Sequence, residues 1–267
     1  MAKVLRNPSK SDLVHAIHDN WTSMFYLSRK TPGWEWFEKP DATYFLANNE
    51  VQMFNRVEAT KFTTEDADRR IAEVASLFKD KNRPFSWSIN PRDTPIDLPT
   101  RLEKAGLMRS ETPGMAIEIR NLKIPSKPEG FTIEKPKGTR ELDAWARLMA
   151  DAYGLGGMTE PFVNITHNIS YCKEMLNYTG LLNGRPVATA SVFLADGVAG
   201  VYCIATAPEA RGRGIGSYIT ATPLLEAQEM GYEVSILHAT KMGYPVYERL
   251  GFQEVCKKVS YSWNMPT

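Results

Sequence analysis

A glycine-rich loop between a β-prone run and a helical run most constrains the fold of this chain. Residues 198–206, VAGVYCIAT, favour a strand, and residues 215–230 have the apolar spacing of an amphipathic helix. The loop between them contains Arg211-Gly212-Arg213-Gly214-Ile215-Gly216. A helix that begins just after a strand presents unpaired backbone N–H groups and the positive end of its dipole, which attract anions. We therefore expect an α/β fold with an anion-binding site at this junction.

The glycine spacing of this loop fits one of three known phosphate-loop patterns. A Walker A loop needs Gly-Lys at the fifth and sixth positions after its first glycine, where Ser217 and Tyr218 stand after Gly212. A dinucleotide fingerprint counted from Gly212 also meets Ser217 in place of its last glycine. That fingerprint further belongs early in a βαβ domain, whereas this loop lies late in the chain. The spacing Arg-x-x-Gly-x-Gly, which starts at Arg211, fits at every position.

The surrounding C-terminal half alternates strands and helices, as expected for a mixed α/β sheet. An Asn183-Gly184 pair between two β-prone runs favours a hairpin. Pro223 lies inside the helix behind the glycine loop, and an interior proline costs about 3 kcal/mol unless the helix kinks. We therefore expect a kink or break at 219–222. The predicted strands are 131–134, 178–182, 187–194, 198–206, 234–238 and 255–263, and the predicted helices are 139–153, 169–176, 215–230 and 245–250.

Length and a linker-like stretch predict two domains. The chain has 267 residues, against a prior of roughly 150 residues per domain. Residues 120–138 are rich in proline and lysine and poor in apolar side chains. We place the domains at 1–122 and 129–267. In the first domain we predict helices at 64–79 and 98–105 and a strand at 85–89. We expect Thr64 to cap the N-terminus of the helix 64–79, and Thr139 to cap that of the helix 139–153 in the second domain.

The two predicted domains share a weak internal repeat. Each ends with a strand, a proline-containing loop, a short helix, a glycine and a further strand, so that Gly106 corresponds to Gly251 and Leu102 to Tyr247. The glycine loop corresponds to residues 60–65 of the first domain, which contain no glycine. The first domain is therefore expected to be a degenerate copy that keeps the fold without the loop.

Two segments of the C-terminal half carry a family resemblance. Residues 201–216, VYCIATAPEARGRGIG, look like motif A of the GNAT superfamily of N-acetyltransferases. Residues 243–252, GYPVYERLGF, look like its second hallmark, a Tyr-x-x-Leu-Gly-Phe segment starting at Tyr247. The resemblance covers about 130–262 and is only topological over the first domain. It implies two tandem GNAT-like domains, the second of them the catalytic N-acetyltransferase domain.

The resemblance also implies roles for individual residues. The end of the strand at 198–206 would pair with the pantetheine arm of acetyl-CoA, and a backbone N–H near Cys203 or Ile204 would polarise the thioester carbonyl. Tyr247 would give a proton to the departing thiolate. Thr240 stands where many members carry an asparagine, which leaves its role open. The residues expected at the cofactor are Cys203, Ile204, Ala205, Thr206, Arg211, Gly212, Arg213, Gly214, Ile215, Gly216, Ser217 and Thr240.

The general base is less defined by the sequence. An ammonium acceptor with a pKa near 10 must lose a proton before its nitrogen can attack. Glu160 is the candidate catalytic base, and with Tyr247 it completes the predicted catalytic residues. It lies in the Gly/Pro-rich loop 154–161, which by the resemblance would line the acceptor side. A solvated loop carboxylate, with a water chain as the base, is the alternative. Cys203 is expected to be a small buried residue rather than a nucleophile, because no histidine is adjacent in sequence to activate it.

The sequence as a whole predicts an N-acetyltransferase that transfers an acetyl group from acetyl-CoA to the amine of a small molecule by direct attack. A non-catalytic acyl-CoA-binding sensor and a protein or peptide acetyltransferase are the alternatives. A net charge of +1 gives no electrostatic argument for a nucleic-acid or membrane partner. Three widely spaced cysteines and four histidines suggest neither disulfides nor a metal site. We expect a cytoplasmic protein, and the sequence leaves a homodimer open.

Overall fold

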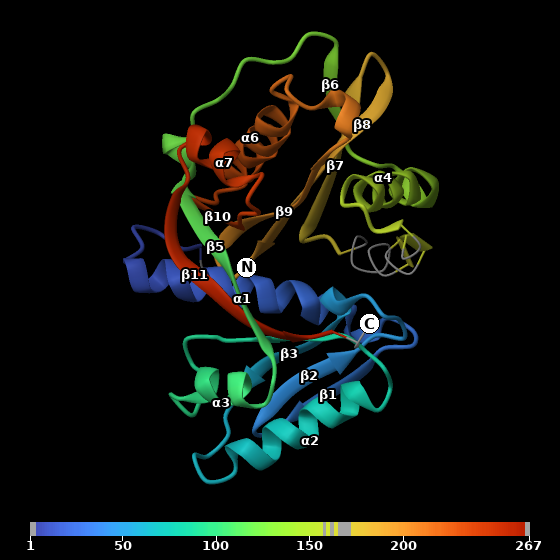
Figure 1. Ribbon diagram of the computed structural model, residues 1–267. Helices are drawn as coiled ribbons and strands as arrows, with labels where there is room; N and C mark the ends of the chain where they lie inside the picture. The colour runs from blue at the N-terminus through green and yellow to red at the C-terminus, as the bar shows by residue number, and fades with distance from the viewer. Residues whose placement is uncertain (1–3, 157–158, 161–162, 165–171, 265–267) are drawn as a thin grey trace. The chain divides into compact units, whose positions relative to one another are not determined.

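The computed structural model describes residues 4–156, 159–160, 163–164 and 172–264 (Figure 1). The chain divides into two compact units. Unit 1 comprises Met1–Ser28 and Pro113–Cys256, and unit 2 comprises Arg29–Thr112 and Lys257–Thr267. Among the described residues, no helix is both long enough and apolar enough to cross a membrane.

Unit 1 is built on six strands in the order β5-β10-β9-β8-β7-β6. Neighbouring strands run antiparallel except β9 and β10, which are parallel. The Asn183-Gly184 turn joins β7 to β8 with both residues at positive φ, which confirms the predicted hairpin. The elements are α1 Lys10–Tyr26, β5 Met108–Glu118, β6 Phe131–Glu134, α4 Gly138–Ala152, β7 Met175–Leu182, β8 Arg185–Ala195, β9 Val198–Thr206, α6 Ile215–Glu229, β10 Val234–His238, α7 Tyr244–Leu250 and the first part of β11 Gln253–Trp263.

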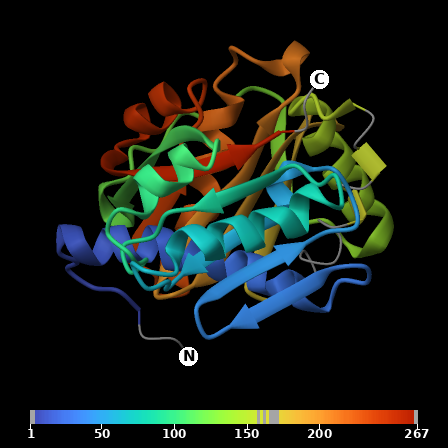
Figure 2. The same ribbon diagram turned by 60° about the horizontal axis from the view of Figure 1, so that its bottom comes forward.

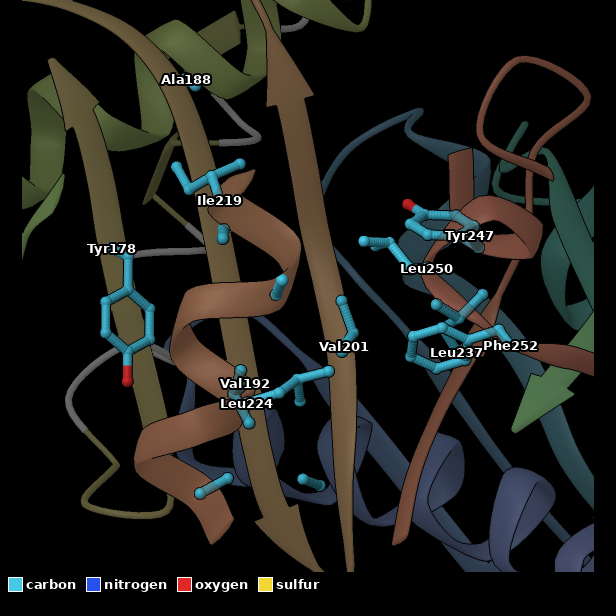
Figure 3. Packing of buried hydrophobic residues seen from close by; sticks show 14 of the residues in the cluster. Tyr178, Ala188, Val192, Val201, Ile219, Leu224, Leu237, Tyr247, Leu250 and Phe252 are labelled. Atoms are coloured by element: carbon cyan, nitrogen blue, oxygen red, sulfur yellow. The ribbon is translucent and has the colours of Figure 1, made fainter. Parts of the chain in front are cut away.

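The strands of unit 1 bury side chains on both faces. The larger core lies against α6 and α7, where Val201 of β9 packs near Leu224, and Tyr247 and Leu250 gather beside Leu237 (Figure 3). Alternate residues of β9 point to the other face. There Tyr202 donates to Asn20 of α1, so the N-terminal helix covers strands that lie far from it in sequence.

The sheet strands of unit 2 lie in the order β1-β2-β3-β4-β11. The pairs β1–β2, β2–β3 and β4–β11 are antiparallel, and β3–β4 is parallel. The helix α2 lies along one face of this sheet and buries an apolar stripe there (Figure 2). The elements are β1 Glu35–Lys39, β2 Ala42–Leu46, β3 Asn55–Thr60, α2 Ala67–Lys79, β4 Phe85–Ser88 and α3 Leu98–Lys104, with the end of β11.

The two halves of the chain repeat the same succession of elements. The series β1-β2-β3-α2-β4-α3-β5 corresponds to β7-β8-β9-α6-β10-α7-β11, with two antiparallel pairings followed by one parallel pairing in each. The loop between β3 and α2 spans 61–66 and contains no glycine. The internal repeat seen in the sequence is therefore confirmed as a repeat of topology.

The last strand of each half pairs in the unit formed mainly by the other half. Residues 114–118 of β5 pair with β10 in unit 1, and residues 260–263 of β11 pair with β4 in unit 2. The compact units consequently differ from the division at 1–122 and 129–267 expected from the sequence. Unit 1 also takes α1 from the N-terminal half.

Several predicted element ends are corrected by the structure. The helix α6 runs uninterrupted through Pro223, so of the predicted kink or break at 219–222 the break is excluded and the kink stays a prediction. The helices α2 and α4 begin after Asp66 and Lys137 rather than after threonine caps. The predicted helix 169–176 is wrong at its end, because Met175 begins β7, and residues 169–171 lie outside the described residues.

Candidate functional site

The site is built around a point where β9 and β10 part. The two strands pair only over 199–201 and 235–237, although β9 continues to Thr206. Cys203 lies at this point with φ +53°, and the register of β9 against β8 shifts here. A positive φ at a residue other than glycine is uncommon and is stabilised here by its surroundings. The bulge turns the end of β9 out of its pairing with β10.

The edge of β9 beyond this bulge presents main-chain groups. Ala207 N donates to Val187 O at 2.8 Å, which directs that residue toward β8. Because successive residues of a strand alternate, the main-chain groups of Ile204 and Thr206 face away from β8. Cys203 O instead accepts from Thr189 Oγ1 at 2.8 Å. The free edge is thus formed by the N–H groups of Ile204 and Thr206, because Ile204 O accepts from Tyr153 Oη and Thr206 O accepts from Arg211 Nε.

The glycine loop continues directly from this edge into α6. Gly212 and Gly214 have φ of +75° and +77°, and a Cβ added to either would meet nothing within 4 Å. Gly214 is the N-cap and makes no side-chain cap bond, and the first intrahelical bond runs from Tyr218 N to Gly214 O. The N–H groups of residues 215–217 therefore precede the helical ladder and can bind an anion.

The two arginines of the loop have different positions. Arg211 donates through Nε to Thr206 O at 3.0 Å and through Nη2 to Ala152 O at 3.4 Å. It therefore joins the loop to the ends of β9 and α4. Arg213 is exposed and adds positive charge beside the helix N-terminus. The predicted residues Cys203–Thr206 and Arg211–Ser217 thus lie on the end of β9 and on the loop that leads into α6, with Ala205 and Ile215 buried, and their contact with a cofactor stays a prediction.

Tyr247 lies on α7 with only 8% of its surface exposed. Its ring packs edge-on against Phe252, and a Cβ on Gly243 would lie 2.8 Å from its Cε2 atom. Figure 3 shows its hydroxyl directed toward the side on which β9 runs. Burial raises the pKa of Tyr247 above its usual value. The phenol therefore carries its proton at neutral pH, and the raised pKa makes it a weaker acid than an exposed tyrosine.

Thr240 lies in the turn just before α7, the helix that holds Tyr247. Its Oγ1 accepts from Gly243 N at 3.1 Å, and its carbonyl accepts from Tyr244 N at 2.9 Å. These bonds satisfy N–H groups at the start of α7. The hydroxyl therefore has a structural role on α7, and a contact of Thr240 with a cofactor stays a prediction.

Glu160 forms an ion pair with Arg147 of α4. Its Oε2 accepts from Arg147 Nη2 at 3.1 Å, and 64% of its side chain is exposed. Hydrogen bonding to Arg147 holds the pKa of Glu160 below its usual value. An acidic, ion-paired carboxylate is a weak base, so this geometry does not favour Glu160 as the group that deprotonates an amine.

Two residues of the site region were missed in the sequence. Tyr153, at the end of α4, donates through its hydroxyl to Ile204 O at 3.4 Å. Burial of that hydroxyl raises the pKa of Tyr153 well above its usual value, and nearby Cys203 and Tyr247 add to the rise. Asn20 of α1 binds Tyr202, the residue before the bulge. No local pattern marks either residue, because both contacts join segments distant in sequence.

Cys203 has the properties of a structural residue. Burial raises the pKa of its thiol to about 12, with a small opposing effect of Ser191. A thiol with so high a pKa is not a thiolate nucleophile at neutral pH. Among the described residues, no group of three or more His, Cys, Asp or Glu side chains is arranged to hold a metal ion.

Comparison with known proteins agrees with this geometry. Residues 195–255 match a family model described as an acetyltransferase (GNAT) domain. A GCN5-related N-acetyltransferase from Kribbella flavida is similar over 95% of this chain and 96% of its own, with a TM-score of 0.71 and 20% identity. A tandem GNAT protein of clavulanic acid biosynthesis, solved without AcCoA, is similar over 94% and 95%, with a TM-score of 0.62 and 12% identity.

A third solved structure extends the range of similar proteins. It is a GCN5-related glucosamine N-acetyltransferase region of a fungal multi-domain GH3 β-N-acetylglucosaminidase. It is similar over 98% of this chain and 38% of its own chain, with a TM-score of 0.65 and 14% identity. No curated protein matches this sequence. At these identities the likeness establishes the fold, and the expected α/β GNAT fold with tandem copies is confirmed.

Proposed function

We propose that this GNAT-fold chain is an N-acetyltransferase that transfers an acetyl group from acetyl-CoA to the amine of a small molecule. One observation carries the proposal. The free main-chain edge of β9 leads without interruption into the glycine loop at the N-terminus of α6, and a buried phenol on α7 is directed toward the same side. A long acyl thioester with a pyrophosphate needs this combination of strand edge, anion site and proton donor.

The binding groups fit the parts of such a molecule. The N–H groups of residues 215–217 and the charge of Arg213 would hold the pyrophosphate, since Gly212 and Gly214 leave the approach open. The main-chain N–H groups of Ile204 and Thr206 would donate to carbonyl oxygens of the pantetheine arm, since their own carbonyl oxygens already accept from Tyr153 and Arg211. A backbone N–H at Cys203 or Ile204 would polarise the thioester carbonyl.

The thioester supplies an acyl carbon that a neutral amine can attack directly. The C–N bond forms, the C–S bond breaks, and Tyr247 gives its proton to the departing sulfur. The proton lost by the amine passes to solvent through water, because the ion pair with Arg147 leaves Glu160 a poor acceptor. The tyrosinate then recovers a proton from solvent, which completes the cycle without a covalent enzyme intermediate.

Turnover distinguishes this proposal from an acyl-CoA-binding sensor. Thiol release from acetyl-CoA should be measured over a panel of primary amines, together with acetyl-CoA affinity. Tyr247→Phe is expected to lower kcat about 10²–10⁴-fold and to leave acetyl-CoA binding within a few-fold. Binding without thiol release on any amine would instead establish a sensor. Release only with peptide amines would show that the acceptor class is wrong.

A further inference from the structure

We propose that Tyr153 limits the length of the acyl group that this enzyme transfers. The inference rests on the proposed function, because it concerns the acyl group held at the free edge of β9. Tyr153 reaches that edge from α4, and its hydroxyl donates to Ile204 O at 3.4 Å.

The position of Tyr153 follows from the side of the sheet on which α4 lies. Figure 1 shows α4 and α6 on opposite sides of the strands β7, β8 and β9. Tyr247 belongs to the α6 and α7 side, and Tyr153 enters from the α4 side. Cys203 and Tyr247 are both near enough to its phenol to influence its pKa. The Tyr153 ring therefore closes the far side of the place where β9 leaves β10.

The main chain around Tyr153 is fixed. Tyr153 N donates to Met149 O at 3.0 Å, and Gly154 N donates to Asp151 O at 3.0 Å, which ends α4 at this residue. The neighbouring Ala152 O accepts from Arg211 Nη2 at 3.4 Å, which ties the same turn to the cofactor loop. The main chain of this turn is thus fixed by the helix end and by the loop, and the side chain of Tyr153, which is 44% exposed, is held at its hydroxyl by the strand carbonyl.

An acyl chain would meet the Tyr153 ring soon after its carbonyl carbon. A donor that polarises the carbonyl lies about 2.7–3.1 Å from its oxygen, and the proposed donors are the N–H groups of Cys203 and Ile204. The hydroxyl of Tyr153 donates a hydrogen bond to the carbonyl oxygen of the same Ile204. An acetyl methyl fits between them, whereas a longer chain must displace the ring.

The test compares acetyl-, propionyl-, butyryl- and hexanoyl-CoA with the full-length protein and one amine. For the wild type, kcat/KM is expected to fall about 10-fold or more for each added methylene. Tyr153→Ala is expected to raise the butyryl-to-acetyl ratio at least about 10-fold. Tyr153→Phe is the matched control: it keeps the ring and is expected to keep the ratio within about 3-fold of the wild type.

An unchanged ratio in Tyr153→Ala would overturn the inference, as would an equal change in both variants. Tyr153→Leu supplies a second truncation if the alanine variant does not fold. Acyl-CoA dissociation constants over the same chain lengths give a readout that needs no turnover. A wild type that releases no thiol from any acyl-CoA contradicts the proposed function, whereas turnover with an unaltered length profile contradicts only the role of Tyr153.

Discussion

A substitution at Gly216 can test whether the glycine loop binds acetyl-CoA without disturbing the fold. Unlike Gly212 and Gly214, it does not have positive φ, and a Cβ there would meet only Thr206 Oγ1 at 3.6 Å, an ordinary contact. Gly216→Ala should therefore fold normally, since alanine favours a helix by up to about 1 kcal/mol over glycine. The added methyl would lie at the first turn of α6, whose N–H groups are those proposed to bind the pyrophosphate. We expect an unchanged or higher Tm and an acetyl-CoA affinity lowered about 10-fold or more, measured by calorimetry.

The matched comparison is Gly214→Ala, where positive φ adds backbone strain. That variant is expected to lose both stability and affinity. If Gly216→Ala binds acetyl-CoA as tightly as the wild type, the pyrophosphate does not approach α6 at this residue.

Lys258 gives unit 2 a stability that depends on pH. It lies on β11, is buried, and has its pKa lowered to about 7, first by burial and then by Arg56, with Glu58 opposing. Arg56 and Glu58 already pair with each other, so a proton on Lys258 adds net charge to a buried cluster. Between pH 7 and pH 10.5 the unfolded chain holds this proton and the folded chain does not, so the free energy of unfolding rises with pH.

Lys258→Met is expected to remove this rise, which is on the order of 1 kcal/mol for each unit of the pKa change. Lys257→Met, at the exposed neighbouring position, is the control and should keep it. Urea unfolding at pH 7, 8.5 and 10 measures the difference between each variant and the wild type. If the free energy of unfolding depends on pH in the same way in Lys258→Met and in the wild type, Lys258 is charged in the folded protein.

At the scale of elements, Asn20 is a buried side chain through which α1 is hydrogen-bonded to β8 and β9. Asn20 Nδ2 donates to Ala195 O at 3.0 Å, and its Oδ1 accepts from Tyr202 Oη at 2.7 Å. Asn20→Ala would leave both buried partners unsatisfied, which costs about 1–3 kcal/mol for each group. We expect a loss of about 2–4 kcal/mol in the free energy of unfolding, measured with urea.

A double-mutant cycle isolates the contact between α1 and β9. Tyr202→Phe removes one end of the hydrogen bond, and the coupling energy with Asn20→Ala is expected to be about 0.5–3 kcal/mol. Additive effects of the two substitutions would mean that the hydrogen bond between Asn20 and Tyr202 does not contribute to holding α1 on β9.

The elements of the C-terminal half were predictable because their signals are local. The strands 131–134, 198–206 and 234–238 were predicted with their observed ends, since turns or glycines bound them in the sequence. Pro223 was misleading, because packing of α6 against the strands, through Leu224 for example, outweighs the lost hydrogen bond. The same packing buries Leu224 completely.

The N-terminal half was less predictable for physical reasons. α1 has a capping box from Ser9 and Asp12, a local signal that could have marked its start. Its burial against β9, and the pairing of β5 with β10, depend on contacts across more than a hundred residues that no window of sequence displays. The glycine loop and Tyr247 could be located by their spacing, whereas Tyr153 enters the site only because of how α4 ends.

At the scale of the whole molecule, the tandem copies share strands. Each copy has the succession of elements of the other, yet β5 completes the sheet of unit 1 and β11 that of unit 2. The N-terminal half therefore supplies both a strand and a helix to the unit that holds the cofactor loop. This sharing gives the copy without a glycine loop a structural contribution to that unit.

The last prediction concerns the fragment 129–267, which contains the glycine loop and Tyr247 but lacks α1 and β5. Without them the outer edge of β10 is unpaired, and apolar residues that α1 and β5 cover, Val198 and Ile236 among them, meet solvent. We expect the fragment alone to aggregate and to bind no acetyl-CoA. Co-expression with the fragment 1–122 should restore a soluble complex, because each fragment provides a strand that the other lacks. Size-exclusion chromatography with an acetyl-CoA binding assay distinguishes an aggregated fragment 129–267 from its soluble complex with 1–122. A fragment 129–267 that is monomeric and binds acetyl-CoA by itself would show that the shared strands are dispensable.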